Sequence, residues 1–141
     1  MPAESVVDAL RKVHRLLRPG GVALNCRPVA SGPTLEVSIW SGNTPLGPLP
    51  YIDAFIRNIQ DAGAGFDLLC DEGLFAKGPH ARYTVAIRFA SLNEWEQYWA
   101  AEAPDYAPPN DGLLPAINEL MAQPVAELVM RKPIEATRFG V

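Results

Sequence analysis

Histidine is the side chain best suited to acid–base chemistry near neutral pH, and the sequence holds two, His14 and His80. An imidazole changes charge close to physiological pH, so a well-placed histidine can accept or donate a proton during a reaction. His80 follows a proline in a polar segment, whereas His14 stands among basic residues of a predicted surface helix. His80 is therefore the candidate catalytic residue.

The sequence contains no other familiar arrangement for catalysis. It has no Ser-His-Asp or Cys-His set, no phosphate-binding loop and no cluster of residues at metal-ligand spacing. Cys26 and Cys70 stand singly in predicted apolar strands, so we expect two buried thiols rather than a disulfide or a zinc site. The only Gly-x-Gly, residues 63–65, leaves a helix and enters a strand, the reverse of a cofactor loop. We interpret it as a helix cap and expect no bound cofactor and no metal.

Composition narrows the class of protein and its partners. The 141 residues are 48% apolar and 20% charged, which is typical of a single globular domain, here residues 1–141. A net charge of −4 argues against binding the phosphate backbone of nucleic acid. No stretch has the length and apolarity of a membrane span or the pattern of a secretion signal, so we expect a cytoplasmic protein without membrane contact.

Hydrophobic periodicity and turn residues predict alternating helices and strands. The first helix is closed by Gly20 and leads into a strand at 22–27, which can form a hairpin with a second strand at 34–40. The segments 41–50 and 72–82 are predicted loops. The remaining predicted helices are residues 50–62, 91–101 and 113–121, and the remaining strands are 66–71, 83–89 and 128–139.

Three segments resemble the C-terminal half of class I S-adenosylmethionine-dependent methyltransferases. They are Leu-Leu-Arg-Pro-Gly-Gly at 16–21, Ala-Gly-Ala-Gly-Phe at 62–66 and Arg-Phe-Ala-Ser-Leu-Asn-Glu-Trp at 88–95. In that family the third segment opens a helical insertion before a terminal strand, which residues 132–136 resemble. The resemblance implies an α/β fold, a partial Rossmann-like methyltransferase sheet with a helical insertion near the C-terminus.

The resemblance also suggests a ligand site, because open α/β sheets bind ligands beyond the carboxyl ends of their strands. Arg27 ends the first strand, the loop before the 83–89 strand carries Lys77 and His80, and Trp40 follows the second strand. Arg27, Trp40, Lys77 and His80 are therefore the candidate ligand-binding residues for a small molecule.

The family's glycine-rich cofactor loop is absent from the sequence, so we expect the isolated chain not to be catalytic. This favours a methyltransferase-like interaction module, or one subunit of a split methyltransferase. Strand 22–27 lacks the strands that precede it in the family, and an uncovered apolar edge invites pairing. We therefore expect a homodimer or a missing partner subunit. Asn25 and Arg27 share one face of this strand, which departs from the apolar pattern of a central parallel strand.

A second interpretation starts from the strand at 34–40. From there the predicted order is βαββαβ, the ferredoxin-like α+β order, and Phe-x-Ser-x-x-x-Trp-x-x-Tyr at 89–98 resembles small dimeric α+β barrels. Such a barrel would be an enzyme or binder for an apolar small molecule. Its pocket would be lined by Trp40, Phe89, Trp95 and Trp99.

Overall fold

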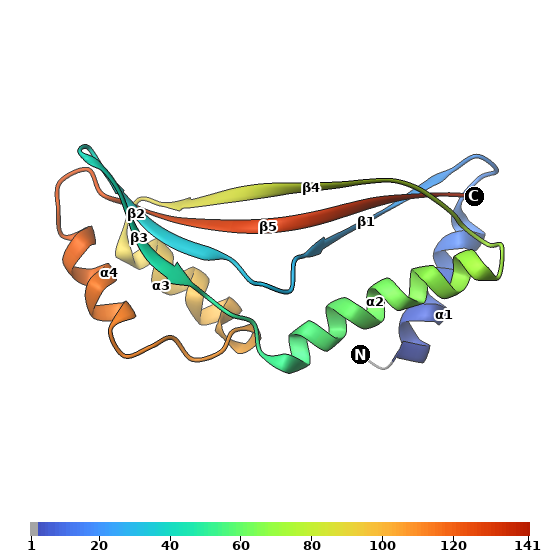
Figure 1. Cartoon of the computed structure of the whole chain (residues 1–141), viewed down its shortest axis with the longest axis horizontal. Coiled ribbons are helices and arrows are strands. Elements are labelled where there is room, and N and C mark those ends of the chain that lie inside the picture. Colours follow the sequence, from blue (N-terminus) through green and yellow to red (C-terminus); the bar gives the residue numbers. More distant parts are fainter. Residues whose placement is uncertain (1–2) are drawn as a thin grey trace. The chain divides into compact units, whose positions relative to one another are not determined.

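The computed structural model describes residues 3–141 and shows an α/β protein with a five-stranded antiparallel sheet (Figure 1). The strand order is β1-β5-β2-β3, and β4 pairs with β5 off that path. An antiparallel sheet fits the ferredoxin-like alternative as well as the methyltransferase-like one. The elements are α1 (Ala3–Leu16), β1 (Val22–Pro28), β2 (Thr34–Ile39), β3 (Gly42–Pro48), α2 (Asp53–Asp71), β4 (Ala76–Phe89), α3 (Leu92–Glu102), a 3₁₀ turn (Ala103–Asp105), α4 (Leu113–Met121) and β5 (Glu127–Gly140).

The chain divides into two compact units, which are described separately. Unit 1 contains the chain up to Val29 together with Ile56–Tyr83 and Ile134–Val141. Unit 2 contains Ala30–Phe55 and Thr84–Pro133. No helix within residues 3–141 is both long enough and apolar enough to cross a bilayer.

In unit 1, β1 pairs antiparallel with the second half of β5, from Val22 opposite Gly140 to Pro28 opposite Ile134. The predicted stop of α1 at Gly20 is wrong, because α1 ends at Leu16; Gly20, with a left-handed φ of 77°, lies in the next turn, where the Gly21 N–H donates to the Arg18 carbonyl at 2.7 Å. Helices α1 and α2 enclose an aromatic core, in which the Phe66 and Phe139 rings stack with centroids 4.2 Å apart. The buried members of this core are Phe66, Leu69, Phe75 and Phe139.

Helix α2 is longer than predicted. The predicted strand at 66–71 is wrong, and Gly63 and Gly65 lie inside the helix instead of capping it. Both glycines provide room for neighbours: a Cβ on Gly63 would lie 2.0 Å from Arg27 Nη1, and one on Gly65 would lie 3.1 Å from Val6 Cγ1. The glycines therefore permit close packing, and they cost the helix some intrinsic stability in return.

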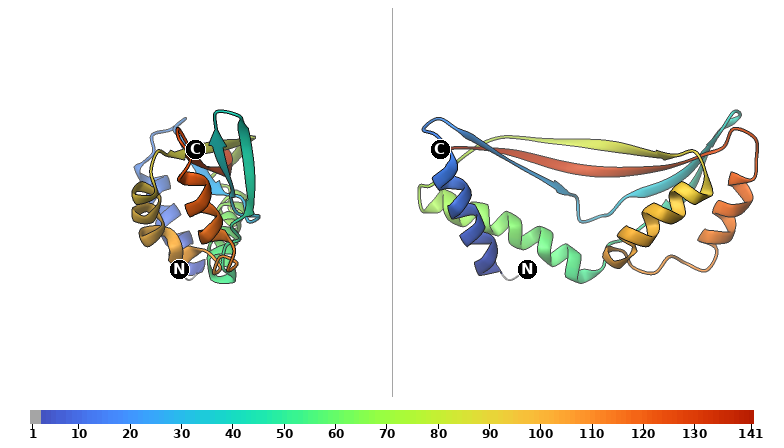
Figure 2. Two further views of the ribbon diagram at one scale, coloured as in Figure 1. Left: turned by 90° about the vertical axis from the view of Figure 1, so that its left-hand side faces the viewer. Right: turned by 180° about the vertical axis from the view of Figure 1, so that it is seen from behind.

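In unit 2, β2 is paired on both sides. It runs antiparallel to the first half of β5, with Leu35 opposite Met130, and antiparallel to β3. The predicted hairpin between 22–27 and 34–40 is therefore wrong, and so is the loop at 41–50, which contains β3. Figure 2 shows β2 and β3 as a hairpin of their own. Pro45 and Pro48 made the β3 segment look like a loop in the sequence. An outer strand tolerates prolines, because the N–H groups on its free edge form no hydrogen bonds to a neighbouring strand.

The helices of unit 2 largely match the prediction. Ser91 caps α3 as expected, since its Oγ accepts a hydrogen bond of 3.2 Å from the Glu94 N–H. Trp95 is buried against Phe89, with ring centroids 5.4 Å apart. Strand β4 starts at Ala76 rather than at residue 83, so much of the predicted polar loop is strand.

Candidate functional site

Arg27 lies near the end of β1, where its side chain crosses α2. The guanidinium Nη1 donates a 3.2 Å hydrogen bond to the Ile59 carbonyl, and it occupies the space that Gly63 leaves open. A partly buried guanidinium needs partners for its donors, and a helix carbonyl and a carboxylate both serve here. Arg27 therefore ties β1 to α2.

Glu135 of β5 supplies the carboxylate. It stands directly opposite Arg27 in the β1–β5 register, and Arg27 Nη2 lies 3.5 Å from Glu135 Oε2. Arg82 of β4 binds the other oxygen, Oε1. The hydrogen bond from Arg82, with the positive charges of Arg82 and Arg27, holds the pKa of Glu135 below its ordinary value. One carboxylate thus joins three strands and, through Arg27, one helix.

His80 lies on β4 and its Nδ1 is 3.0 Å from Thr137 Oγ1, two residues along β5 from Glu135. The structure thus brings Arg27 and His80 to the same group of polar side chains. A hydroxyl beside an imidazole is the geometry of an activated nucleophile, but Thr137 is only 8% exposed and cannot meet a substrate as it stands. His80 as a catalytic residue therefore stays a prediction.

Lys77 is also on β4, and its ammonium pairs with Asp67 of α2 at 2.8 Å. The hydrogen bond and charge of Asp67 raise the pKa of Lys77. Both side chains are more than half exposed, so the pair is open to a ligand but adds little stability. Lys77 as a ligand-binding residue is likewise still a prediction.

The other face of β1 is apolar and exposed. Val22, Leu24 and Cys26 alternate with the side chains that face α2, and Leu24 is 68% exposed. The expectation of a buried Cys26 is wrong, since its thiol is exposed and meets the Tyr83 hydroxyl of β4. We call Val22, Leu24, Cys26 and Tyr83 the bare face. Within residues 3–141, β1 pairs only with β5, so its other edge has no partner strand.

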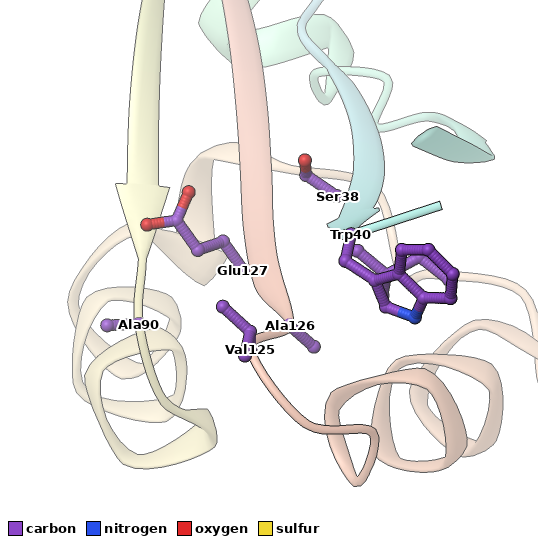
Figure 3. A pocket seen from close by; sticks show the side chains of 7 residues that line it. Ser38, Trp40, Ala90, Val125, Ala126 and Glu127 are labelled. Carbon is purple, nitrogen blue, oxygen red and sulfur yellow. The ribbon is translucent and has the colours of Figure 1, made fainter. Parts of the chain in front are cut away.

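Trp40 lies in unit 2, at the turn between β2 and β3, and its side chain is 89% exposed. Figure 3 shows Trp40 among residues that line a hollow at the ends of β2 and β4 and the start of β5. The volume of this hollow is about 500 Å³. The lining residues are Ser38, Ile39, Trp40, Ala90, Val125, Ala126 and Glu127.

The four aromatic residues of the barrel hypothesis do not share a pocket among the hollows described. Trp95 and Trp99 stack with centroids 5.2 Å apart and line a separate hollow of about 230 Å³ between α3 and α4. Phe89 is buried and lines neither hollow, and Trp40 lines the one at the strand ends. A shared pocket formed by these four residues in a dimeric barrel therefore stays a prediction.

Sequence reasoning missed Glu135 and Val125. Glu135 belongs to the same alternating face as Thr137 and Phe139, a pattern that could have marked it as the partner of an inward arginine. Val125 carries no sequence signal, because only its backbone conformation distinguishes it.

Comparison of this chain with models of protein families, with curated proteins and with solved structures finds no match.

Proposed function

We propose that this protein is a methyltransferase-like interaction module without catalytic activity of its own. It works by pairing through β1, and its partner is a second copy of the chain. The observation that carries the proposal is the unpaired edge of β1 beside the bare face.

The element order supports the methyltransferase-like origin. A helix and a turn at Pro19 and Gly20 lead into β1, a long helix precedes β4, and a helical insertion separates β4 from the terminal strand β5. In unit 1, β5 lies between β1 and β4, which suits a terminal strand inserted antiparallel into a Rossmann-like sheet. Within residues 3–141, no Gly-x-Gly turn leads from a strand into a helix, which supports a module that does not hold the family's cofactor itself.

A second copy fits the β1 edge by symmetry. Two β1 strands related by a two-fold axis at Asn25 would run antiparallel, which places Leu24 opposite Cys26 of the other copy. Arg27 would stand opposite Ala23, so no like charges meet directly. Edge pairing would set the two bare faces side by side on one sheet surface, where Leu24 of each copy contacts Cys26 of the other across the paired strands.

Size-exclusion chromatography with light scattering tests the proposal. At micromolar concentration we expect a mass near twice 15.3 kDa. Leu24→Lys should give the monomer mass, because it puts a charge into the centre of the pairing. The control is Leu114→Lys, which alters an exposed leucine of α4 in unit 2 and should leave the dimer intact. A monomeric wild-type chain, or a dimer that survives Leu24→Lys, would contradict the proposal.

A thermal melt with S-adenosylhomocysteine tests the absence of a cofactor site. A ligand at a hundred times its dissociation constant stabilises the fold by about 2.7 kcal/mol, which raises the melting temperature measurably. We expect no rise. A rise would show that the chain holds the cofactor itself, which would contradict the proposal of a module without a cofactor site.

A further inference from the structure

We propose that the hollow beside Trp40 in unit 2 binds a neutral saccharide, with a pyranose ring stacked on the indole. This inference concerns a different unit from the β1 edge and does not depend on the proposed function. The volume of the hollow, about 500 Å³, falls within the range of small-molecule sites.

Trp40 has no structural reason to occupy its position. It belongs to the two-residue connection between Ile39 and Gly42, where hairpins favour Asn, Asp or Gly because those residues suit the turn. Its side chain is 89% exposed, and among the described residues it has no aromatic neighbour, unlike Trp95 and Trp99. A large flat apolar surface is thus held in water, which costs solvation free energy without stabilising the fold.

The other side of the hollow is strained. Val125, which precedes β5, has a φ of 59°, a left-handed conformation that a β-branched residue rarely adopts. Val125 is 84% exposed, so packing of its side chain does not explain the strain. The β2–β5 register ends with Ser38 opposite Glu127, and beyond this pair Trp40 and Val125 both line the hollow. Conformations of this kind cluster at binding sites.

The charges beside the hollow indicate the class of ligand. Glu127 is the one charged residue in the lining, and Arg88 Nη1 neutralises it through a 2.9 Å contact to Oε2. Farther along the same face of β2, Arg131 neutralises Glu36 at 2.7 Å. A charged ligand would have to compete with an ion pair already formed. A neutral ligand would meet hydroxyl, carboxylate and guanidinium groups that still accept or donate hydrogen bonds at the surface.

A pyranose matches both parts of this surface. Its faces carry C–H bonds that pack on an indole, and its rim carries hydroxyls that suit Ser38 and the Glu127–Arg88 pair. Ser38, Trp40 and Glu127 all line this open hollow, and Figure 3 shows the Glu127 carboxylate on the β4 side of β5 and the Trp40 indole on the β2 side. An open site of this kind holds a ligand by few contacts, so we expect a dissociation constant in the millimolar range.

Nuclear magnetic resonance of the full chain tests the proposal. The indole N–H signals of the tryptophans are followed while cellotriose or maltotriose is added, and the Trp40 signal is assigned by its loss in Trp40→Phe. We expect a saturable shift of the Trp40 signal, with Trp95 and Trp99 unmoved. Trp40→Ala, followed through backbone amides of Ser38 and Glu127, should weaken binding by roughly tenfold, whereas Trp40→Tyr should retain most of it.

The control variant is Leu114→Ala, which alters the hollow between α3 and α4 in the same unit and should leave saccharide binding unchanged. Trisaccharides of glucosamine and of galacturonic acid provide positively and negatively charged probes of equal size. Tighter binding of either charged probe would overturn the assignment to a neutral ligand. No shift at tens of millimolar, or equal binding by Trp40→Ala, would refute the site. A Trp40 shift on protein dilution alone would assign the surface to a second copy instead.

Discussion

The contact between Gly63 and Arg27 leads to a prediction that separates helix propensity from packing. Replacing a glycine inside a helix by alanine gains about 1 kcal/mol of intrinsic stability. At position 63 the new Cβ would lie 2.0 Å from Arg27 Nη1, so the guanidinium must leave its place over α2. The guanidinium would then lose its hydrogen bond to the Ile59 carbonyl. A hydrogen bond from a buried charged donor contributes about 1.5–3 kcal/mol to stability, and the contribution is smaller at this partly exposed position.

We therefore expect Gly63→Ala to change the free energy of unfolding little, or to lower it by up to about 1 kcal/mol, in the natural chain. In an Arg27→Ala background the space is empty, and the same substitution should stabilise the fold by about 1 kcal/mol. The coupling between the two substitutions should thus be at least about 1 kcal/mol.

Urea unfolding of the four chains, followed by circular dichroism, measures this coupling. The matched control is Gly65→Ala, whose Cβ would approach Val6 on α1 instead of Arg27. That substitution should be additive with Arg27→Ala within about 0.5 kcal/mol. Additivity at Gly63 as well would refute the reasoning, because it would mean that the arginine does not occupy the space the glycine leaves.

Three further measurements test other contacts. In urea unfolding, Gly32→Ala should lower the free energy of unfolding more than Gly73→Ala. Both glycines have a φ near 75°, a left-handed conformation that costs alanine about 1–2 kcal/mol in each case. Only at Gly32 would the new Cβ also lie 2.4 Å from a backbone carbonyl oxygen. Trp95→Ala should cost roughly 3–5 kcal/mol, since the side chain is 2% exposed, and a loss below about 0.5 kcal/mol would contradict its burial. The pKa of Glu135 is lower in the folded chain than in the unfolded chain, where it is about 4.3. Glu135 should therefore contribute fully to the free energy of unfolding above that pH, and this contribution should be lost as the pH falls toward its folded pKa. Arg82→Ala should weaken that acid sensitivity, and an unchanged pH profile would count against the pairing.

Local signals predicted those elements whose stability is mainly local. The capping pair of α3, Ser91 and Glu94, acts within a few residues, so it was readable from the sequence. The second half of α2 was not, because Gly63 and Gly65 resemble a helix end when read alone. Their role depends on Arg27 and on α1, which lie far away in the chain. Tertiary packing thus overrides the propensity of these glycines.

For the candidate site residues too, local sequence signals identified some features and tertiary contacts determined the others. Arg27 stood out as a charged residue at the end of a strand, and the structure gives it Ile59 and Glu135 as partners. Those partners depend on the register between β1 and β5, which no local pattern specifies. Trp40 was singled out by its place after the second predicted strand. The backbone strain at Val125, which marks the same hollow, is a property of the folded chain and has no counterpart in composition or spacing.

The two faces of β1 bear on which partner can occupy its edge. In a parallel Rossmann-like sheet a central strand is covered on both faces and is apolar throughout. Asn25 and Arg27 make one face of β1 polar, and Arg27 keeps contact with water at the side of the Glu135 pair. An antiparallel second copy would add a strand with the same polar face, so the Asn25 side chains of the two copies would meet and could hydrogen-bond to each other. The polar face of β1 therefore favours the homodimer over a missing cofactor-bearing half.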